Sequence, residues 1–432
     1  MSEPFRVAIA GLGTVGAETL AMLRRQAGPW ASRGGRAIEV VAVSARDRQR
    51  DRGVDLSGIE WFDDPVAMAD RAPAEAFIEL IGGADGVAKA SVETALSSGR
   101  HVVTANKALI ARHGAALARR AAEQNLALGY EAAVAGGIPI IKTVREGMAA
   151  NSLTRIYGIL NGTCNFILSK MRQTGRSFAE VLEEAQALGY AESDPRFDID
   201  GTDSAHKLSI LAALAFGFEV DFDSVYVEGI GGISAFDIAS AEELGYRIKL
   251  LGVASLQADG VEQRVHPCMV RQGTPIAAVE GVLNAVVAVG DAAGSIMVEG
   301  AGAGAGPTAS AIIADLVDIA RGNVMPAFTI PASQLGRMRG KPMEAHRGCY
   351  YIRLTVRDQP GVIADIAAVL RDEEVSMEAM LQHGRADSEG KSVPVVITTH
   401  ETSEAAMRRA IATIDTCTAV LEPSSLIRIE TL

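Results

Sequence analysis

Hydrophobic and polar residues alternate along the first 130 residues in a pattern that predicts short strands separated by helices. Apolar runs typical of buried strands occupy residues 5–10, 39–43, 76–81, 101–104 and 126–130. Residues 15–26 and 87–97 instead carry the amphipathic spacing of helices. Because this alternation is typical of a parallel sheet covered by helices, we expect an α/β domain over residues 1–130.

The middle of the chain, residues 131–325, predicts a mixed α+β domain. A glycine-rich segment, residues 294–306, precedes the last of three helical patterns, which occupy residues 178–188, 203–216 and 309–321. Prolines and glycines then interrupt every periodicity over residues 326–348, which is typical of a linker.

Residues 349–432 predict a compact third domain. The predicted strands occupy residues 350–356, 375–381, 393–399 and 425–429, and the predicted helices occupy residues 362–370 and 403–414. Their order, strand–helix–strand–strand–helix–strand, is that of a ferredoxin-like fold.

Composition narrows the possible partners and the compartment. The chain has 41 Lys plus Arg against 53 Asp plus Glu, a formal charge of −12, which argues against a nucleic acid because phosphate contacts need clustered basic residues. Its four cysteines lie far apart, as expected of reduced thiols in the cytoplasm. The longest strongly apolar run, residues 208–218, is shorter than the roughly 20 residues of a membrane span. We therefore expect a cytoplasmic protein that binds neither nucleic acid nor membrane.

Glycine is enriched, at 44 of 432 residues, and three glycines form a cofactor signal. The segment Gly11-Leu12-Gly13-Thr14-Val15-Gly16 follows the first predicted strand directly and opens a helix, as a dinucleotide site requires. In such a site Gly11 permits the tight turn, Gly13 lets a pyrophosphate approach the backbone, and Gly16 lets the helix pack on the strand. The N–H groups at the start of the helix would face the phosphates.

The residues after the second predicted strand bear on the choice of dinucleotide. An acidic residue there binds the ribose 2′-hydroxyl of NAD, whereas arginine or a small polar residue suits the 2′-phosphate of NADP. The chain has Ser44 and Arg46, and its acidic residue, Asp47, comes late. This order favours NADP, with NAD as the alternative if Asp47 turns inward.

Two segments carry residues suited to acid–base chemistry. Thr104-Ala105-Asn106-Lys107 ends a predicted strand, at the edge where open α/β sheets bind ligands. In the acid-rich residues 189–207, Asp203 and Lys207 are four apart, so a helix would place them on one face. Capping and solvation could explain these charges, but the apolar residues 208–211 predict a largely buried helix. A partly desolvated lysine at a cleft can act as an acid or a base.

Four motifs, in this order, resemble the homoserine dehydrogenase family. They are Gly11 to Gly16, Thr104 to Lys107, Asn161-Gly162-Thr163-Cys164-Asn165-Phe166-Ile167-Leu168, and Gly189 to Lys207. The resemblance implies NAD(P)-dependent interconversion of aspartate 4-semialdehyde and homoserine, a step in threonine, methionine and isoleucine biosynthesis. The last domain resembles an ACT domain, a small-molecule-sensing module, so the chain is similar to the monofunctional form that carries one.

The resemblance implies roles for residues of the second and the fourth motifs. Lys207 and Lys107 correspond to the family's two active-site lysines. Lys207 would donate a proton to the carbonyl oxygen, and Lys107 would lie against cofactor and substrate. The implied substrate-binding residues are Glu192, Asp198 and Asp203, with Glu192 binding the ammonium group and Asp198 orienting Lys207.

Backbone-rich segments complete the implied site. Thr104 joins the cofactor site, and residues 302–308 resemble a late glycine-rich loop that brings Gly306 to the cofactor, although an interdomain hinge would have the same composition. Residues 130–139 resemble the segment that holds a monovalent cation, usually sodium, largely through main-chain carbonyls. These implied cation ligands are Glu131, Val134, Gly136 and Ile138.

The ACT-like domain implies an amino-acid effector. Asp358, Gln359 and Gly361 match the loop of ACT domains in which a glycine lets the backbone approach an amino acid. Threonine is the expected effector, acting by feedback inhibition, and a dimerisation module without a ligand is the alternative. ACT domains commonly pair, so we expect a homo-oligomer, a dimer or a tetramer.

Two other functions fit parts of the sequence. Cys164 could be the thiolate nucleophile of another Rossmann-type semialdehyde dehydrogenase, such as aspartate-semialdehyde dehydrogenase. No histidine lies near it in the sequence, so we expect a buried packing residue. A non-catalytic amino-acid or nucleotide sensor is the other alternative, and the presence of Lys107, Lys207 and Glu192 argues against it.

Overall fold

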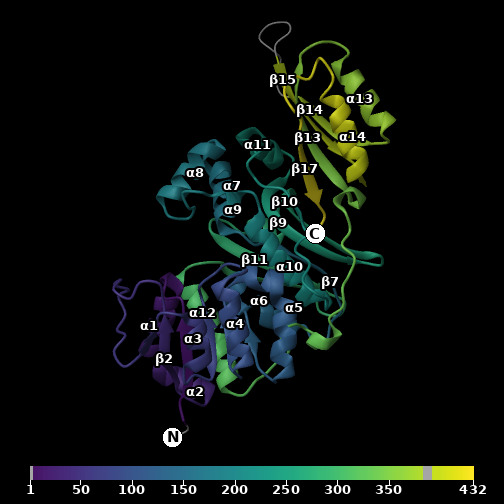
Figure 1. The fold of residues 1–432 in the computed structure, drawn as a ribbon. Coiled ribbons are helices and arrows are strands. Elements are labelled where there is room, and N and C mark those ends of the chain that lie inside the picture. The colour runs from purple at the N-terminus through teal and green to yellow at the C-terminus, as the bar shows by residue number, and fades with distance from the viewer. Residues whose placement is uncertain (1–2, 383–391) are drawn as a thin grey trace.

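A six-stranded parallel sheet forms the N-terminal part of the computed structural model, which describes residues 3–382 and 392–432 (Figure 1). Its strand order is β3-β2-β1-β4-β5-β6. The strands are β1 Phe5–Ala10, β2 Ile38–Ser44, β3 Glu60–Phe62, β4 Ala76–Glu79, β5 His101–Thr104 and β6 Leu128–Gly129. The predicted Rossmann-type arrangement is confirmed, although the strand expected at residues 126–130 contains only two residues.

Helices cover both faces of this sheet because the strand side chains alternate between two cores. Val7 and Ile9 face a core shared with α1 and α12, while Ala8 and Ala10 face α3, α4 and α5. The helices are α1 Thr14–Arg25, α2 Ala27–Gly34, α3 Pro65–Arg71, α4 Val87–Ser97, α5 Lys107–Glu123 and α12 Ala305–Ala320. Helix α12, which comes from near position 310, thus completes the helical layer on one face of the N-terminal sheet. It begins four residues before the predicted helix.

A second sheet of 11 strands organises the rest of the described chain. The middle of the chain contributes five strands, which form one end of this sheet in the order β12-β11-β7-β9-β10. They are β7 Leu153–Ile159, β9 Tyr246–Gln257, β10 Gly260–Arg271, β11 Leu283–Gly290 and β12 Gly294–Ala301. Most of the predicted glycine-rich segment is therefore strand β12, because its backbone pairs antiparallel with β11. The helices here are α7 Gly162–Thr174, α8 Phe178–Ala187, α9 Arg196–Ile199, α10 Thr202–Phe216 and α11 Ala235–Glu243.

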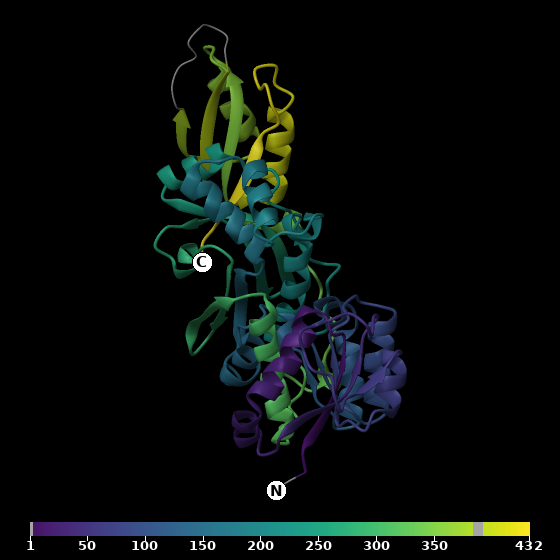
Figure 2. The same ribbon diagram turned by 90° about the vertical axis from the view of Figure 1, so that its left-hand side faces the viewer.

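The C-terminal domain has the predicted strand–helix order and continues the same sheet. Its elements are β13 Arg347–Arg357, α13 Val362–Asp372, β14 Met377–Gln382, β15 Ser392–Thr399, α14 Glu404–Ile414 and β17 Ser425–Glu430. Strand β17 pairs with β13 on one side and, in parallel, with β10 on the other. Figure 2 shows the result, an elongated molecule with the N-terminal sheet at one end and this domain at the other.

The segment expected to be a linker, residues 326–348, is held against the second sheet. Val261 of β10 donates its N–H to the Arg339 carbonyl at 2.9 Å and accepts from the Lys341 N–H at 2.8 Å. His346 is buried, with its Nδ1 2.6 Å from the Glu262 carboxylate. The residues that make these contacts do not follow the periodicity of a helix or strand, so the sequence pattern did not predict them.

Shorter elements connect these parts. They are α6 Ile140–Lys142, β8 Tyr226–Val227, β16 Thr402–Ser403 and the helical turns Glu131–Ala133, Thr143–Gly147, Pro275–Ala278, Ala332–Gln334 and Met343–Ala345. Within residues 3–382 and 392–432, none of the helices has the length and apolarity that a membrane crossing requires.

Candidate active site

The glycine loop after β1 forms a cradle at the start of α1. An added Cβ at Gly11 would lie 2.5 Å from the Leu80 carbonyl oxygen, and one at Gly16 would lie 2.0 Å from the Gly11 carbonyl oxygen. Gly11 also has φ of +100°, a conformation that favours glycine. By contrast, an added Cβ at Gly13 would point into open space. Two glycines are therefore required by packing, and Gly13 leaves room for a phosphate at the helix N-terminus.

A cavity of about 430 Å³ opens beside this loop, on the side of β2. The loop after β2 contributes its polar lining, which includes Ser44, Arg46, Asp47, Arg50 and Arg52. Asp47 turns its carboxylate back on its own loop, where Oδ1 accepts the Gln49 N–H at 2.9 Å and the Arg50 N–H at 3.3 Å. Arg46 is exposed, which leaves its guanidinium accessible to an anion.

Arg52 ties the two loops of the cradle together, a role that the sequence pattern did not suggest. Its Nε donates to the Leu12 carbonyl at 3.1 Å, and its guanidinium also donates to the carbonyls of Arg50 and Asp47. Since Leu12 belongs to the glycine loop, the main chain on both sides of the cavity is held by one side chain.

Asp203 joins the two predicted lysines into one cluster. Its Oδ1 lies 2.9 Å from Lys107 Nζ, at the start of α5, and its Oδ2 lies 2.7 Å from Lys207 Nζ, one turn along α10. Lys207 Nζ also donates to the Leu160 carbonyl at 2.7 Å. The two lysines come from the N-terminal sheet and from the middle unit, so tertiary packing alone brings them together.

Asn161 supports this cluster from the N-terminus of α7. Its Oδ1 accepts the Cys164 N–H at 2.9 Å, which caps the helix, while its Nδ2 donates to Asp198 at 2.8 Å and to Asp203 at 2.9 Å. Asp198 therefore reaches Lys207 only indirectly, through Asn161 and Asp203. Asn161 lay in one of the four motifs that resemble the family, but no helix was predicted after it. An asparagine at a helix start is the capping signal that could have identified its role.

Charge and burial act in opposite directions on the two aspartates. Burial favours the neutral form of Asp203, but the ammonium groups of Lys207 and Lys107 outweigh it and hold the pKa of this carboxyl well below its usual range. Burial instead raises the pKa of Asp198, despite the hydrogen bond from Asn161. Asp203 is therefore ionised, and it lies between the ammonium groups of the two lysines.

Thr104 is the last residue of β5. Its side chain is fully buried and donates from Oγ1 to Glu79 Oε2 at 2.7 Å, while Asn106 donates its N–H to the same hydroxyl at 2.9 Å. The other Glu79 oxygen accepts the N–H groups of Ile81 and Gly82. The pair fixes the ends of β4 and β5, and Glu79 was not predicted because a buried acid inside an apolar run gives no periodic signal.

Among the described residues, no hydrogen bond or ion pair joins the predicted substrate ligand Glu192 to the lysine cluster. Its side chain is exposed, and its carboxylate has no partner among residues 3–382 and 392–432. Its main-chain carbonyl accepts from Gln186 Nε2 at 3.0 Å.

The late glycine loop leads into the N-terminus of α12. Gly304, with φ of +112°, precedes the first residue of this helix, and an added Cβ at Gly306 would point into open space. Gly302 lies against the turn at Gly136, whose added Cβ would be 2.5 Å from the Gly302 carbonyl oxygen. The predicted cofactor loop and the predicted cation segment are therefore in direct contact.

Cys164 is fully buried on α7. Burial raises the pKa of its thiol well above the usual value, and Sγ donates to the Asp198 carbonyl at 3.3 Å. A buried thiol held in its neutral form is a poor nucleophile. This environment favours the packing role over the thiolate chemistry of the alternative enzyme.

The predicted effector loop joins β13 to α13. Gly361 precedes the helix with φ of +97°, in the left-handed region, and an added Cβ there would point into open space. Gln359 is exposed beside it. The loop thus has the accessible backbone that amino-acid binding requires, at the opposite end of the molecule from the glycine loop of α1 (Figure 1).

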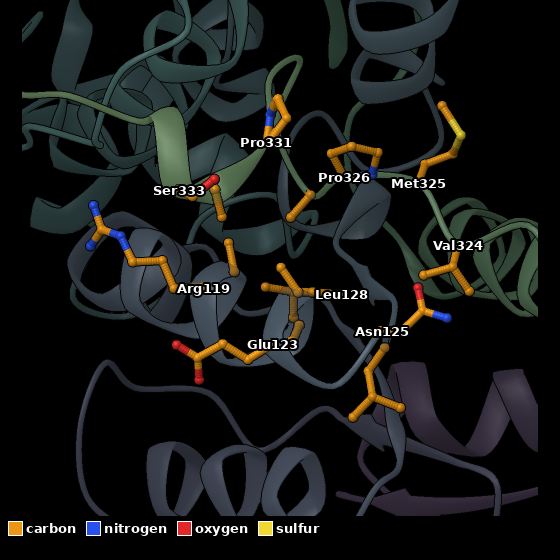
Figure 3. A pocket seen from close by; sticks show the side chains of 15 residues that line it. Arg119, Glu123, Asn125, Leu128, Val324, Met325, Pro326, Pro331 and Ser333 are labelled. Carbon is orange, nitrogen blue, oxygen red and sulfur yellow. The ribbon is translucent and has the colours of Figure 1, made fainter.

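A further cavity of about 460 Å³ lies between the end of α5 and residues 324–333 (Figure 3). Arg119, Met325 and Pro331 contribute to its wall. Twelve residues of helix separate Arg119 from Lys107, a distance of roughly 18 Å. Because its lining holds no cluster of acid–base groups, the lysine cluster is the candidate active site.

A dinucleotide cradle on a parallel sheet, next to a pair of lysines, defines an oxidoreductase that uses a nicotinamide cofactor. The family model for homoserine dehydrogenase matches residues 139–317, that for the homoserine dehydrogenase NAD-binding domain matches residues 11–131, and that for the ACT domain matches residues 350–415. A homoserine dehydrogenase of Neisseria gonorrhoeae is 44% identical over 100% of this chain and 99% of its own length. The chain belongs to the homoserine dehydrogenase family.

Solved structures agree with this assignment. A homoserine dehydrogenase from Thiobacillus denitrificans superposes with a TM-score of 0.92 at 44% identity, covering 99% of this chain and 98% of its own. A hyperthermophilic archaeal homoserine dehydrogenase in complex with NADPH has a TM-score of 0.64 at 25% identity, covering 75% of this chain and 100% of its own. The Rossmann-type domain, the catalytic domain and the C-terminal ACT domain predicted from the sequence are confirmed.

Proposed function

We propose that this chain interconverts aspartate 4-semialdehyde and homoserine with NADP(H), using Lys207 and Lys107 as its catalytic lysines. The observation that carries the proposal is the bridge that Asp203 makes between the two ammonium groups. The bound nicotinamide cofactor supplies or accepts the hydride. The chain's own groups bind the substrate, hold its reacting oxygen and move a proton.

Lys207 has one donor left for the substrate. An ammonium group carries three N–H bonds, and contacts to Asp203 and to the Leu160 carbonyl use two of them. The third can donate to the carbonyl oxygen of the semialdehyde, and in the reverse direction Nζ takes the proton of the homoserine hydroxyl. Asp203 and Glu192 would hold the polar groups of the substrate, with Asp198 positioned through Asn161.

The direct test is the reduction of NADP that depends on homoserine, followed by absorbance of the reduced cofactor. We expect turnover with homoserine and none with substrates that lack its hydroxyl group, because Lys207 acts on that oxygen. If the purified full-length chain bound NADPH but did not turn over homoserine, the sensor alternative would replace the proposal.

NADP is the proposed cofactor because the accessible guanidinium of Arg46 lines the cavity beside the glycine loop, while the Asp47 carboxylate is occupied by its own loop. The residues that would hold the dinucleotide are Gly11, Leu12, Gly13, Thr14, Val15, Gly16, Ser44, Arg46, Thr104, Lys107 and Gly306, with Thr104 acting from behind the site. The NADPH complex of the archaeal relative supports this choice.

Replacing Arg46 by alanine should raise the KM for NADP about tenfold and leave the KM for NAD within about twofold. The reason is the loss of a charge-assisted hydrogen bond to the 2′-phosphate, worth about 1.5–3 kcal/mol. Arg48→Ala is the matched control, since Arg48 stacks on Trp61 at 5.9 Å and does not line the cavity. Equal changes for NADP and NAD would contradict the assignment of Arg46 to the phosphate.

A monovalent cation, sodium, is proposed at the turn after β6. The ligands would be the main-chain carbonyls of Glu131, Val134, Gly136 and Ile138. No described residue donates to the carbonyls of Val134 or Gly136, and oxygen donors suit a hard cation. The Glu131 carboxylate is itself engaged, because it accepts the N–H groups at the start of α6 at 2.8 and 3.0 Å.

Amino-acid feedback through the ACT domain, with threonine as effector, is the proposed regulation. Its support is a chain of contacts from this domain toward the lysine cluster. Arg428 of β17 pairs with Glu228 at 3.0 Å, and two residues later the Ile230 N–H donates to the Ile199 carbonyl at 2.9 Å. Ile199 ends α9, next to Asp198, so these contacts connect β17 to Asn161 and Asp203. A movement of β17 would therefore be transmitted to the lysine cluster.

Gln359→Ala should weaken threonine inhibition at least tenfold and leave the activity without threonine unchanged. Gln359 belongs to the proposed effector loop and is far from the lysines. The variant is made in the full chain, because truncation would remove β17 from its pairing with β10. Inhibition constants for threonine are compared with those of Arg371→Ala, an exposed control on α13. Unchanged inhibition in Gln359→Ala would place the effector elsewhere.

A homo-oligomer is proposed as the functional state. Strand β14 lies at the open edge of the second sheet and exposes Met377 at 38% and Met380 at 44%. An exposed strand edge with apolar side chains is a ready surface for pairing with another chain. This supports a dimer or tetramer built at least partly through the ACT domain.

A further inference from the structure

A column of three rings extends from the active-site lysine Lys107. Lys107 Nζ lies 5.5 Å from the centroid of the Phe197 ring, and that ring lies 5.8 Å from the His206 ring. His206 stacks on Phe222 with centroids 4.3 Å apart and planes only 8° from parallel. The Arg112 guanidinium closes the column, 4.6 Å from the Phe222 centroid.

This aromatic column joins two units of the fold. Both cations, Lys107 and Arg112, lie on α5 of the N-terminal sheet, whereas Phe197 lies on α9 and His206 on α10. The cations thus bracket the rings from one helix. Because the negative face of a ring attracts a cation, the column fixes α5 and the α9–α10 segment relative to each other.

His206 serves the column as a neutral ring. Burial lowers its pKa, and the positive charge of Lys107 lowers it further, so the imidazole does not compete with the two cations. Its Nδ1 is buried and makes no hydrogen bond of good geometry among the described residues, although the Thr202 main chain lies close enough to raise its pKa. The ring packs between Phe197 and Phe222, so stacking accounts for the position of this histidine.

Phe197 is exposed, unlike the other two rings. Its exposure is 46%, although it is a large apolar residue next to a cluster of charges. The Lys107 side chain is also one-third exposed, and its only described ion pair is with Asp203. Without the ring, a long side chain with one anchor would sample several rotamers, whereas an anchor on each side restricts Nζ to one place.

We propose that Phe197 is a positioning residue for the reaction, which holds the ammonium group of Lys107 in its catalytic place through the aromatic column. The proposal rests on the proposed role of Lys107. It adds a contact of a second kind, cation–π, to the ion pair with Asp203. It also assigns a function to an exposed aromatic residue that the charged motif around it does not explain.

The test compares a ring with an apolar side chain of similar size at position 197. Phe197→Leu should lower kcat about tenfold, corresponding to a cation–π contribution of about 1.4 kcal/mol. The dissociation constant of NADPH, measured by fluorescence, should stay within about twofold, because the glycine cradle is untouched. Phe197→Tyr keeps an aromatic face and should restore kcat to within about twofold of the wild type.

Two further variants separate the column from general damage. His206→Leu should lower kcat, and His206→Phe should restore most of the loss, since only a ring is required. Trp30→Leu removes a ring with a similar contact, 5.3 Å from the Arg33 guanidinium on α2, and should not change kcat. Thermal unfolding is measured for all variants, and Phe197→Leu should lower the unfolding temperature by only a few degrees, because one contact of a half-exposed side chain is lost.

The proposal is wrong if Phe197→Leu turns over at the wild-type rate, or if Phe197→Tyr is as impaired as Phe197→Leu. It is also wrong if His206→Phe is inactive, since a proton-transfer role for the imidazole would then replace stacking. All rates are ratios to the wild-type chain. Absence of homoserine turnover in the wild type itself would instead contradict the proposed function.

Discussion

Lys207→Met is expected to lower kcat by about three orders of magnitude in both directions of the reaction. General acid–base groups contribute about 10²- to 10⁴-fold, and methionine has a similar length but no proton to donate. The loss should fall on kcat more than on the KM of either substrate, because the contact strengthens as charge develops on the oxygen. Stopped-flow and steady-state rates of NADPH oxidation with the semialdehyde measure this effect.

NADPH binding to Lys207→Met provides the check on folding. Binding should be nearly unchanged, since Asp203 keeps Lys107 as its counter-ion and the glycine cradle lies on another element. Lys170→Met is a matched control, because Lys170 forms a surface ion pair with Glu184 on the same middle unit. Turnover of Lys207→Met above about a tenth of the wild-type rate would exclude Lys207 as the proton donor.

Asp203→Asn is expected to reduce kcat/KM by at least about a hundredfold, and also to destabilise the fold. The amide has the shape of the carboxyl group but leaves the two ammonium groups facing each other without an anion. Removing one partner of a buried pair typically costs about 3–5 kcal/mol. Urea unfolding at several pH values measures the stability, and initial rates measure the activity.

The pH dependence of this difference has a definite sign. Because the lysines lower the pKa of Asp203 below its ordinary value of 3.8, its contribution to stability is present above that pH and is lost as the pH falls through the lowered value. The gap between wild type and Asp203→Asn should therefore be constant from pH 5 to 8 and shrink only in strong acid. Asp200→Asn, an exposed neighbour, is the control and should show no gap. A gap that closed near pH 6 would contradict the lowered pKa.

Physical arguments disfavour both alternative functions, the thiolate-dependent semialdehyde dehydrogenase and the non-catalytic sensor. Burial keeps the Cys164 thiol protonated, which disfavours covalent thiolate catalysis. A non-catalytic sensor would have no need to hold two lysines around one buried carboxylate, an arrangement that costs desolvation energy. Membership of the homoserine dehydrogenase family agrees with both arguments.

Local physics explains the predictions that succeeded. The glycine loop could be recognised because two of its requirements are local: Gly16 lies against the Gly11 carbonyl, and Gly11 has φ of +100°. The contact of Gly11 with Leu80, by contrast, depends on the tertiary structure. The ferredoxin-like order of the last domain followed from strand and helix periodicities, each of which depends only on nearby residues. At residues 294–301, part of the glycine-rich segment, no strand was predicted, because glycines weaken the periodicity of a strand, and pairing with β11 makes the strand there.

The sequence by itself determined the class of this protein: its short-range patterns specified the nucleotide-binding sheet, the acid–lysine helix and the ACT-like domain. Only the tertiary structure decided which of these groups meet. Lys107 and Lys207 are 100 positions apart, and Asp203 joins them because α5 and α10 pack together. The hydrogen bonds of Asn161 and the aromatic column on Lys107 leave no periodic pattern in the sequence. Each is assembled from separate elements, and the relative placement of those elements depends on burial of the whole core.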